Sequence, residues 1–481
     1  DSEEITQHVP QYVPRGLTSF TGSNAENLIA LSSGDITYTD GEPFFANVPE
    51  PVEFAPFEDW AQVGDDIDGD AAGDRSGYSV SMNAAGNIVA IGGYAADGSD
   101  GTDGAGQVKV YQKNGSTWTQ IGDTIEGTET TEYSGHSVSM NAAGDRVAIG
   151  SLFLETTKTT YYAATGPNNN ATSITTIVKT GGVRVYQNIA GTWTQLGPTF
   201  YGDVDEGHFG EAGYSVSMNA AGDRVAIGAP KSSLNKGSFI IAQYDAELGS
   251  WAGMHSWRDG ESNGDQFGTS VSLNAAGDTV AVGARYNDGN GSDSGHVKVY
   301  QWAQDENNQT YLLTQIGNDI DGEAVGDQSG FSVSLNATGD VVAIGAIYNS
   351  GNGTHSGHVR VYKNISGTWT QLGTDIDGEA VSDQSGYSVS MNDAGSVVAI
   401  GARRADHTGG YNAGHVRVYY YINDAWTLFG NDIDGETSYD GSGFSVSLNA
   451  VGDRVAIGAP DNGENGMWSG HVRVYGDATA L

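Results

Sequence analysis

The sequence predicts an all-β fold, namely a seven-bladed β-propeller of four-stranded antiparallel blades. Three observations lead to this prediction: one short phrase recurs seven times, four strand-like segments recur within each repeat, and the segment missing from the last repeat stands near the start of the chain. A closed ring of small sheets accounts for all three, because each sheet hides its faces against its two neighbours.

The recurring phrase is G-x-S-V-S-(M/L)-N. Its seven copies begin at Gly77, Gly135, Gly213, Gly268, Gly330, Gly386 and Gly443. Self-similarity at a regular spacing is the signature of a repeat fold. The copies are 55 to 62 residues apart, except that Gly135 and Gly213 are separated by 78 residues. We therefore expect seven structural units, with an insertion in the second.

Each unit contains four segments rich in Val, Ile, Tyr and Trp. In one unit these are FSVSLN from Phe331, VVAIGA from Val341, HVRVY from His358 and TWTQLG from Thr368. They partly alternate apolar with polar residues and are separated by Gly, Asn and Asp, as half-buried antiparallel strands and their turns require. No stretch has a sustained helical period. Each unit is therefore expected to form one four-stranded sheet.

The two ends of the repeat region predict how the ring closes. After HVRVY at His471 to Tyr475 only six residues remain, so the last unit lacks its fourth segment. The missing pattern occurs as WAQVG from Trp60 to Gly64. We expect residues 60–64 to form the outer strand of the last blade and so to close the ring.

The chain is expected to divide into an arm, a propeller and a tail. The predicted ranges are 1–56 for an extended N-terminal arm, 57–476 for the propeller, 152–180 for a projecting insertion within it, and 477–481 for the tail. Prolines disfavour strand pairing in much of the arm, although Leu28 to Tyr38 could form a strand. The arm either lies across the ring or adds a strand to a neighbouring subunit. The insertion is expected to be a β-rich hairpin that contacts a partner.

Composition excludes several classes of function. Lys and Arg total 21 against 60 for Asp and Glu, and the formal charge of −39 excludes a nucleic-acid partner and favours a cation. Cysteine is absent, which excludes disulfides and thiolate metal sites. No apolar run is long enough to span a bilayer, and the first residue is Asp, as in a secreted or cell-surface protein whose signal segment has been removed.

Acidic loops before the recurring phrase predict calcium sites. In four loops the carboxylates stand at positions 1, 3, 5 and 9, a spacing that could direct successive ligands at one cation. They are Asp66, Asp68, Asp70 and Asp74; Asp319, Asp321, Glu323 and Asp327; Asp375, Asp377, Glu379 and Asp383; and Asp432, Asp434, Glu436 and Asp440. Oxygen ligands and glycine turns favour Ca²⁺. Alternatively, these side chains hydrogen-bond the loop backbone.

The direction of the strands predicts where the acidic loops lie. Strands of a meander alternate in direction, so the crossover between blades and the loop between the second and third strands should meet at one end of each sheet. Both are acidic or polar, and one face of the ring should therefore gather most of the negative charge. Seven Asn-x-Ser/Thr sequons are glycosylation candidates: Asn114, Asn170, Asn290, Asn308, Asn336, Asn352 and Asn364.

The histidines favour a protein without a catalytic centre. One His recurs at the same place in four units, at His296, His358, His415 and His471, and is expected to be a packing feature. The recurring Arg360, Arg417 and Arg473 are expected to pair with nearby acids. His208, His255 and His407 do not recur and are the remaining candidates for catalysis. Because no nucleophile, phosphate-loop or zinc-helix motif is present, we predict that the chain is not an enzyme.

The frame G-(F/Y)-S-V-S, then V-A-I-G-A with Pro after it at Pro230 and Pro460, then G-x-V-x-V-Y, resembles the FG-GAP repeats of integrin α-chain-like propellers. The resemblance covers about residues 57 to 476. It implies a secreted or surface-exposed propeller used in adhesion or binding, sometimes within a larger enzyme. FG-GAP repeats generally carry calcium between the first and second strands, where this chain has only a short N-A-A-G-D turn. The family's metal residues are therefore not carried over.

Three functions fit these observations. The first is an adhesion or structural module that binds other extracellular proteins or glycans, is stabilised by calcium, and could assemble into homo-oligomers or fibres through its arm. The second is a lectin-like module that stacks Trp and Tyr on sugars, although Trp118, Trp193 and Trp369 recur in register and are expected in the blade core. The third is a polysaccharide hydrolase or lyase, which the charge disfavours.

Overall fold

The computed structural model divides the chain into two compact units, Asp1–Glu58 and Asp59–Leu481. In the first unit it describes only β1 (Ile36–Thr39) and β2 (Glu42–Phe45), which pair antiparallel. In the second it describes residues 59–477 except for 163–171, 203–209, 305–310 and 408. Most of the predicted arm, with its proposed strand exchange, lies outside the described residues. No described helix is long and apolar enough to cross a membrane.

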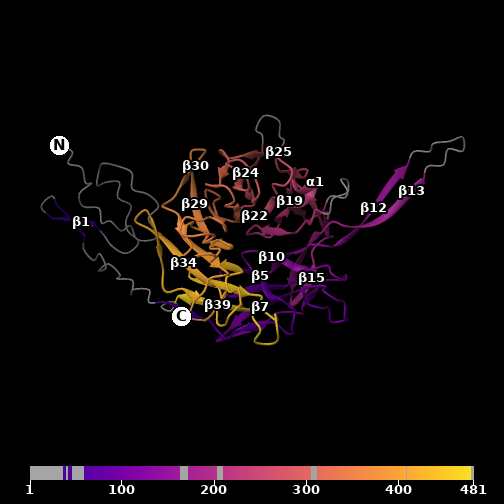
Figure 1. The fold of residues 1–481 in the computed structure, drawn as a ribbon, viewed down its shortest axis with the longest axis horizontal. Coiled ribbons are helices and arrows are strands. Elements are labelled where there is room, and N and C mark those ends of the chain that lie inside the picture. Colours follow the sequence, from indigo (N-terminus) through magenta and orange to yellow (C-terminus); the bar gives the residue numbers. More distant parts are fainter. Residues whose placement is uncertain are drawn as a thin grey trace. The chain divides into compact units, whose positions relative to one another are not determined.

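Seven sheets of the same design follow one another along the second unit (Figure 1). Their main strands are β5 (Ser76–Met82), β6 (Ile88–Gly93), β7 (Gln107–Asn114), β8 (Thr117–Gln120); β10 (Ser134–Met140), β11 (Arg146–Ser151), β14 (Gly182–Ile189), β15 (Thr192–Gln195); β17 (Ser215–Met218), β18 (Arg224–Ala229), β19 (Ser238–Asp245), β20 (Ser250–Gly253); β22 (Phe267–Leu273), β23 (Thr279–Ala284), β24 (His296–Gln304), β25 (Tyr311–Gln315); β27 (Ser329–Leu335), β28 (Val341–Ala346), β29 (His358–Ile365), β30 (Thr368–Gln371); β32 (Ser388–Met391), β33 (Val397–Ala402), β34 (His415–Ile422), β35 (Ala425–Leu428); and β37 (Ser445–Leu448), β38 (Arg454–Ala459), β39 (His471–Asp477), β3 (Trp60–Gln62).

Each sheet also has a fifth, two-residue strand that pairs with the third strand. These are β9 (Ile125–Glu126), β16 (Phe200–Tyr201), β21 (Arg258–Asp259), β26 (Ile320–Asp321), β31 (Ile376–Asp377), β36 (Ile433–Asp434) and β4 (Ile67–Asp68). The insertion in the second blade contains β12 (Glu155–Tyr162) and β13 (Thr172–Lys179), which form a separate antiparallel pair. A single helical turn, α1 (Ser232–Asn235), precedes β19.

The sheets are arranged in a ring. The first strand of each sheet contacts the first strand of the next, and β37 of the last sheet contacts β5 of the first. An isolated parallel bridge joins every sheet to its successor, from Gly106↔Ser134 between the first two to Gly470↔Ser76 between the last and the first. The prediction of an all-β, seven-bladed propeller is confirmed.

The seventh sheet is built from two distant parts of the chain. Strand β3 pairs antiparallel with β39, with Trp60 opposite Asp477 and Gln62 opposite Tyr475. The pairing continues beyond the strand, because Val63 N donates to Val474 O at 2.7 Å. The fourth strand of this sheet therefore precedes the first blade in the sequence.

Two serines of the recurring phrase link neighbouring blades. In the first blade Ser79 Oγ donates to Gly135 O at 2.8 Å, and Ser81 Oγ accepts from Met140 N at 2.9 Å. The same two bonds recur from blade to blade, and those of Ser445 and Ser447 in the last blade reach the first. The alternation of the strand places both serines on one side, so the phrase S-V-S is explained by contact between blades.

The outer strands make a second link through tryptophan. Trp118 Nε1 donates to Val63 O of the preceding blade at 2.7 Å, and Trp60 Nε1 donates to Phe429 O at 3.0 Å. Trp118, Trp193 and Trp369 pack against apolar clusters that combine side chains of two adjacent blades. Their prediction as blade-core residues is confirmed, and the core of this protein lies between its sheets.

We expect Trp60→Ala to lower the free energy of unfolding by about 3–5 kcal/mol, the usual range for removing a buried aromatic side chain. Trp60 is 8% exposed and packs against the cluster of the sixth and seventh blades. Urea unfolding followed by circular dichroism measures the change. Trp468→Ala is the control, because Trp468 is 45% exposed. Equal stability of the two variants would contradict the pairing of β3 with the last blade.

Candidate functional site

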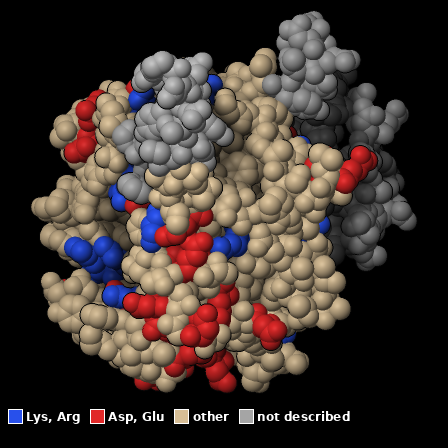
Figure 2. Space-filling model, turned by 90° about the vertical axis from the view of Figure 1, so that its right-hand side faces the viewer, with Lys and Arg blue, Asp and Glu red and all other residues tan. Residues whose placement is uncertain are grey.

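The crossovers and the loops between second and third strands meet at one end of the blades, as expected. Asn290 Nδ2 in such a loop donates to Gly322 O of the adjacent crossover at 2.8 Å, and Asn352 Nδ2 donates to Gly378 O at 2.9 Å. Figure 2 shows one face on which Asp and Glu side chains gather, with Lys and Arg side chains among them. Basic side chains of the third strands lie among the carboxylates of the acidic loops, as Arg360 of β29 does beside Glu323 and Asp375.

The carboxylate at position 9 of each acidic loop is part of the backbone framework. Asp327 is 4% exposed, and its Oδ2 accepts from Ala324 N at 3.1 Å and from Asn349 Nδ2 at 3.0 Å. The equivalent Asp74, Asp383 and Asp440 accept from a backbone N–H three residues earlier in the same way. Burial raises the pKa of Asp383. Hydrogen bonding to the loop backbone, the alternative to metal binding, is what the structure shows for these four.

Positions 1 and 5 meet between loops rather than within one loop. Glu323, at position 5 of one crossover, lies with Asp375, at position 1 of the next, beside His358 at the start of β29. Arg360 pairs with Glu323 and, through Nε, with Asp375 Oδ1 at 3.2 Å. Matching groups are Glu261, His296, Lys298 and Asp319, and Glu379, His415, Arg417 and Asp432.

This grouping differs from the arrangement that the spacing predicted. A crossover runs from one blade to the next. Its first residue therefore lies beside the third strand of one blade, and its fifth residue lies beside the third strand of the next blade. For this reason none of the four loops brings its four carboxylates together within the described residues. The expected pairing of Arg360, Arg417 and Arg473 with acids is confirmed. Calcium binding by these loops stays a prediction.

The remaining predicted ligands have individual surroundings. Asp70, at position 5, pairs with Lys109, and Glu436 Oε1 lies 3.2 Å from Arg473 Nη1. At position 3, Asp321 and Asp377 are exposed, whereas Asp434 Oδ2 lies 3.5 Å from His407 Nδ1. Asp66 and Asp68 lie near Glu464 and His471.

The sequons differ in their access to solvent. Asn114 is exposed. Asn290 and Asn352 use Nδ2 to bond the neighbouring crossover, and Asn364 Nδ2 is buried. Asn336 is 4% exposed, and its Oδ1 anchors the turn before Val341, which leaves no room for a glycan in the folded ring. Asn170 and Asn308 lie outside the described residues.

The non-recurring histidines bond to the backbone. His255 Nε2 accepts from Ile241 N at 3.2 Å, and its Nδ1 lies 2.6 Å from Ser256 O. His407 Nδ1 accepts from Gly409 N at 2.8 Å, and its Nε2 lies 3.0 Å from Gly414 O. His208 lies outside the described residues. The two described rings therefore hold their loops in place.

Aromatic rings line the inner strands, a feature that the sequence analysis missed. They occupy the variable position of G-x-S-V-S and are Tyr78, His136, Tyr214, Phe331, Tyr387 and Phe444, with Thr269 in the fourth blade. Neighbouring rings contact each other across blades, with centroids 5.0 Å apart for Tyr78 and His136 and 4.6 Å for Tyr78 and Phe444. We call this set the aromatic girdle. The recurrence of aromatic residues at the variable position of the repeat could have predicted this set from the sequence.

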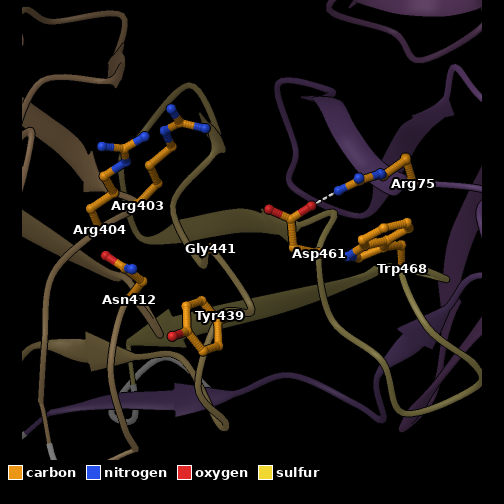
Figure 3. Close-up of a pocket in the computed structure, with 8 residues that line it drawn as sticks. All are labelled: Arg75, Arg403, Arg404, Asn412, Tyr439, Gly441, Asp461 and Trp468. Atoms are coloured by element: carbon orange, nitrogen blue, oxygen red, sulfur yellow. Dashed lines mark ion pairs between the residues drawn. The ribbon is translucent and has the colours of Figure 1, made fainter.

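A cavity of about 340 Å³ lies between the sixth, seventh and first blades (Figure 3). We call it the basic pocket; its lining residues are Arg75, Arg403, Arg404, Asn412, Tyr439, Gly441, Asp461 and Trp468. Arg75 pairs with Asp461 and stacks 4.7 Å from the Trp468 ring. Arg403 stacks 4.2 Å from the Tyr387 ring of the girdle.

Two of the three guanidinium groups have no carboxylate partner in the part of the chain that the structure describes. Among the described residues, no ion pair is recorded for Arg403 or Arg404, although Asp and Glu outnumber Lys and Arg by 60 to 21. The pair stands where other blades carry at most one basic residue after V-A-I-G-A or V-A-V-G-A. This departure of Arg403 and Arg404 from the repeat could have predicted the basic pocket from the sequence.

We expect His136→Phe to reduce the dependence of stability on pH. Burial lowers the pKa of His136 to about 4, and its Nε2 lies 3.2 Å from the Tyr78 hydroxyl. The ordinary pKa is about 6.5, so the unfolded chain binds the extra proton between these values and stability is lost as pH falls through them. In that window, the slope of the unfolding free energy against pH should be smaller in the variant by up to about 1.4 kcal/mol per pH unit. Urea unfolding from pH 7 to pH 4 measures it.

His355→Gln is the control for this measurement, because His355 is exposed. An unchanged slope in His136→Phe would show that the His136 ring does not keep its neutral form in the folded protein.

Comparison with known proteins identifies the repeat. The FG-GAP repeat model matches residues 258–300, from β21 to the middle of β24. Similar solved structures include a putative 6-phosphogluconolactonase from Bacteroides uniformis (10% identity, 75% of this chain and 86% of that chain, TM-score 0.48) and the C-terminal WD40 domain of Sif2 (12% identity, 87% and 98%, TM-score 0.45). No curated protein matches this sequence. The chain is an FG-GAP-like seven-bladed β-propeller.

Proposed function

We propose that this propeller is a secreted or cell-surface, non-catalytic interaction module that acts in adhesion or in building a structure, and that it grips an anionic group of its partner in the basic pocket. One observation carries the proposal: in a chain of formal charge −39, Arg403 and Arg404 line a cavity without a recorded carboxylate partner among the described residues. Elsewhere on the same face, recurring Lys and Arg side chains are paired with acids.

The chemistry of the pocket suits a carboxylate or sulfate. A guanidinium group offers parallel N–H donors that match two oxygens of such a group. Arg403 is held in place by its stacking on Tyr387, while Arg404 is exposed. Asn412 adds an amide to the lining, and Figure 3 shows it on the same side of the cavity as Arg404. The surrounding negative charge would admit one such group more readily than a dense polyanion.

Exposed aromatic side chains at the pocket favour a second candidate, a lectin-like module for acidic glycans. Trp468 is 45% exposed and Tyr439 is 61% exposed, and both line the cavity. Tyr411 is 59% exposed, and its ring contacts that of Tyr439 at 5.6 Å. Flat amphipathic rings of this kind can cover the apolar face of a sugar. A uronic acid would use both the rings and the guanidinium groups.

Calcium and self-assembly are further parts of the proposal. We propose that the acidic crossovers bind calcium and that Asp321 and Asp377, which are exposed and have no ion pair within the described residues, are among its ligands. Assembly through the arm or through the insertion would fit a structural role. Discrete monomers at every protein concentration in size-exclusion chromatography would contradict assembly.

The double change Arg403→Ala/Arg404→Ala should weaken binding to immobilised uronate-bearing glycans at least tenfold. Each charged hydrogen bond contributes about 1.5–3 kcal/mol, and about 1.4 kcal/mol corresponds to a factor of ten. Arg146→Ala/Arg224→Ala is the control, because these side chains bond backbone carbonyls at the hairpin end and the change removes equal charge. Equal loss of binding in both variants would mean that net charge, not the basic pocket, causes the effect. Binding of acidic peptides but not of glycans would favour a protein partner over a glycan.

Calcium should raise the melting temperature of chelator-treated protein, because an ion that binds only the folded state stabilises it by about 2.7 kcal/mol at a hundred times its dissociation constant. Thermal unfolding with EGTA and then with added CaCl₂ measures the shift. Asp321→Asn/Asp377→Asn should remove it, whereas Asp453→Asn, which changes the hairpin end, should not. The absence of any shift in the unaltered protein would remove calcium from the proposal.

A further inference from the structure

Four groups of carboxylates and histidine lie along the acidic crossovers, and one differs from the rest. In each group the potential ligand atoms lie within 4.8 Å of one another. Three groups contain a histidine and two carboxylates, one from each of two successive crossovers. The fourth contains three carboxylates and a histidine: Asp66, Asp68, Glu464 and His471. We call it the closure group, because it lies in the blade that β3 and β39 share.

The three ordinary groups are already neutralised by a basic side chain. Lys298 Nζ lies 3.3 Å from Asp319 Oδ2, Arg360 Nε lies 3.2 Å from Asp375 Oδ1, and Arg417 Nε lies 3.3 Å from Asp432 Oδ1. Each of these residues also pairs with the second carboxylate of its group. A metal ion would have to displace this built-in cation.

The closure group has no such cation among the described residues. Arg473, the equivalent basic residue, instead has Nη1 3.2 Å from Glu436 Oε1, and its Nη2 donates to Asp434 O at 2.7 Å. Within the described residues, no Lys or Arg is recorded in an ion pair with any of the three carboxylates of the group. Glu464 also replaces the glycine that the fourth and fifth blades have at this place, Gly289 and Gly351. The blade thus adds an acid where the compensating charge is missing.

His471 gives the second, independent indication of a ligand. The residue is 1% exposed, and its Nδ1 has no hydrogen-bond partner among the described residues. His358 Nδ1 is likewise without a hydrogen bond, but Arg360 neutralises the carboxylates of that group. The Nδ1 of His471 faces Asp66 Oδ2 at 3.7 Å, which is too long for a hydrogen bond. Two ligands that share a tetrahedral ion at about 2.0–2.2 Å lie about 3.3–3.6 Å apart, so the separation is close to that of two atoms on one metal.

We propose that Asp66, Asp68, Glu464 and His471 bind a divalent transition metal ion of the Zn²⁺ type. Ca²⁺ and Mg²⁺ take oxygen ligands, whereas a neutral imidazole with carboxylates suits Zn²⁺ and its neighbours in the first transition row. The buried nitrogen is supplied by the start of β39, so the site is distinct in ligand type from an all-oxygen calcium loop.

The position of the site gives the ion a structural role. Asp66 lies between β3 and β4 and Asp68 ends β4, whereas Glu464 and His471 belong to the loop and strand that end the propeller. An ion held by all four ties together the two chain segments whose pairing completes the seventh sheet. The side chain of Asn465 already links the same two loops, because its Nδ2 donates to Gly69 O at 2.8 Å. The ion would add a second link beside it.

The test is titration of chelator-treated protein with ZnCl₂, with CaCl₂ and MgCl₂ as competitors, followed by calorimetry and by thermal unfolding. One Zn²⁺ per chain is expected at this site, with a raised melting temperature that a large excess of Ca²⁺ does not replace. Glu464→Gly, which restores the residue found in other blades, should weaken this binding at least tenfold and abolish the shift. Because Glu464 lies in a loop, this variant is expected to fold.

Glu323→Gly is the matched control, since it removes a carboxylate from a group that Arg360 already neutralises, and it should leave the Zn²⁺ affinity unchanged. Failure of the unaltered protein to bind Zn²⁺ with a defined stoichiometry would overturn the proposal. Equal Zn²⁺ affinity in Glu464→Gly would do the same, as would complete replacement of Zn²⁺ by Ca²⁺. None of these outcomes bears on glycan binding at the basic pocket, so the two proposals fail separately.

Discussion

The hydrogen bonds between neighbouring inner strands are the interaction on which the rest of the structure depends. Neighbouring sheets share only isolated backbone bridges, and the serines of S-V-S add further bonds by donating to a glycine carbonyl and accepting a backbone N–H of the next blade. The approach is so close that a Cβ on Gly92 would lie 2.1 Å from Gly135 O. Every crossover, the aromatic girdle and the basic pocket take their positions from this ring.

The negative charge of the crossovers is compensated by a different kind of group at each position. Backbone N–H groups hold the position-9 acids, and Lys298, Arg360 and Arg417 lie between the acids of adjacent loops. Buried imidazoles stay neutral beside them, since burial lowers the pKa of His415 to about 4. Such local compensation lets a chain with a large net charge pack its loops closely. The guanidinium groups of Arg403 and Arg404 take no part in this compensation within the described residues.

The sequence predicted the blades well because repetition reports directly on strands and turns that every unit shares. It predicted the pairing of Arg360 and Arg417 with acids for the same reason. It did not predict which acids meet, because Glu323 and Asp375 belong to different loops and only the ring brings them together. The basic pocket was missed because Arg403 and Arg404 depart from the repeat, whereas the search looked for what recurs. Spacing within one loop carries no information about contacts between blades.

Placing β3 and β39 in one sheet has a consequence for how the molecule is made. During synthesis Trp60 leaves the ribosome long before its partner Asp477 is made. Strand β3 therefore stays unpaired until nearly the whole chain has been synthesised. A contact of such long sequence separation closes late and slowly. Until then the growing chain is an open arc with two exposed flanks, and its vulnerability to aggregation ends only when the last strand arrives.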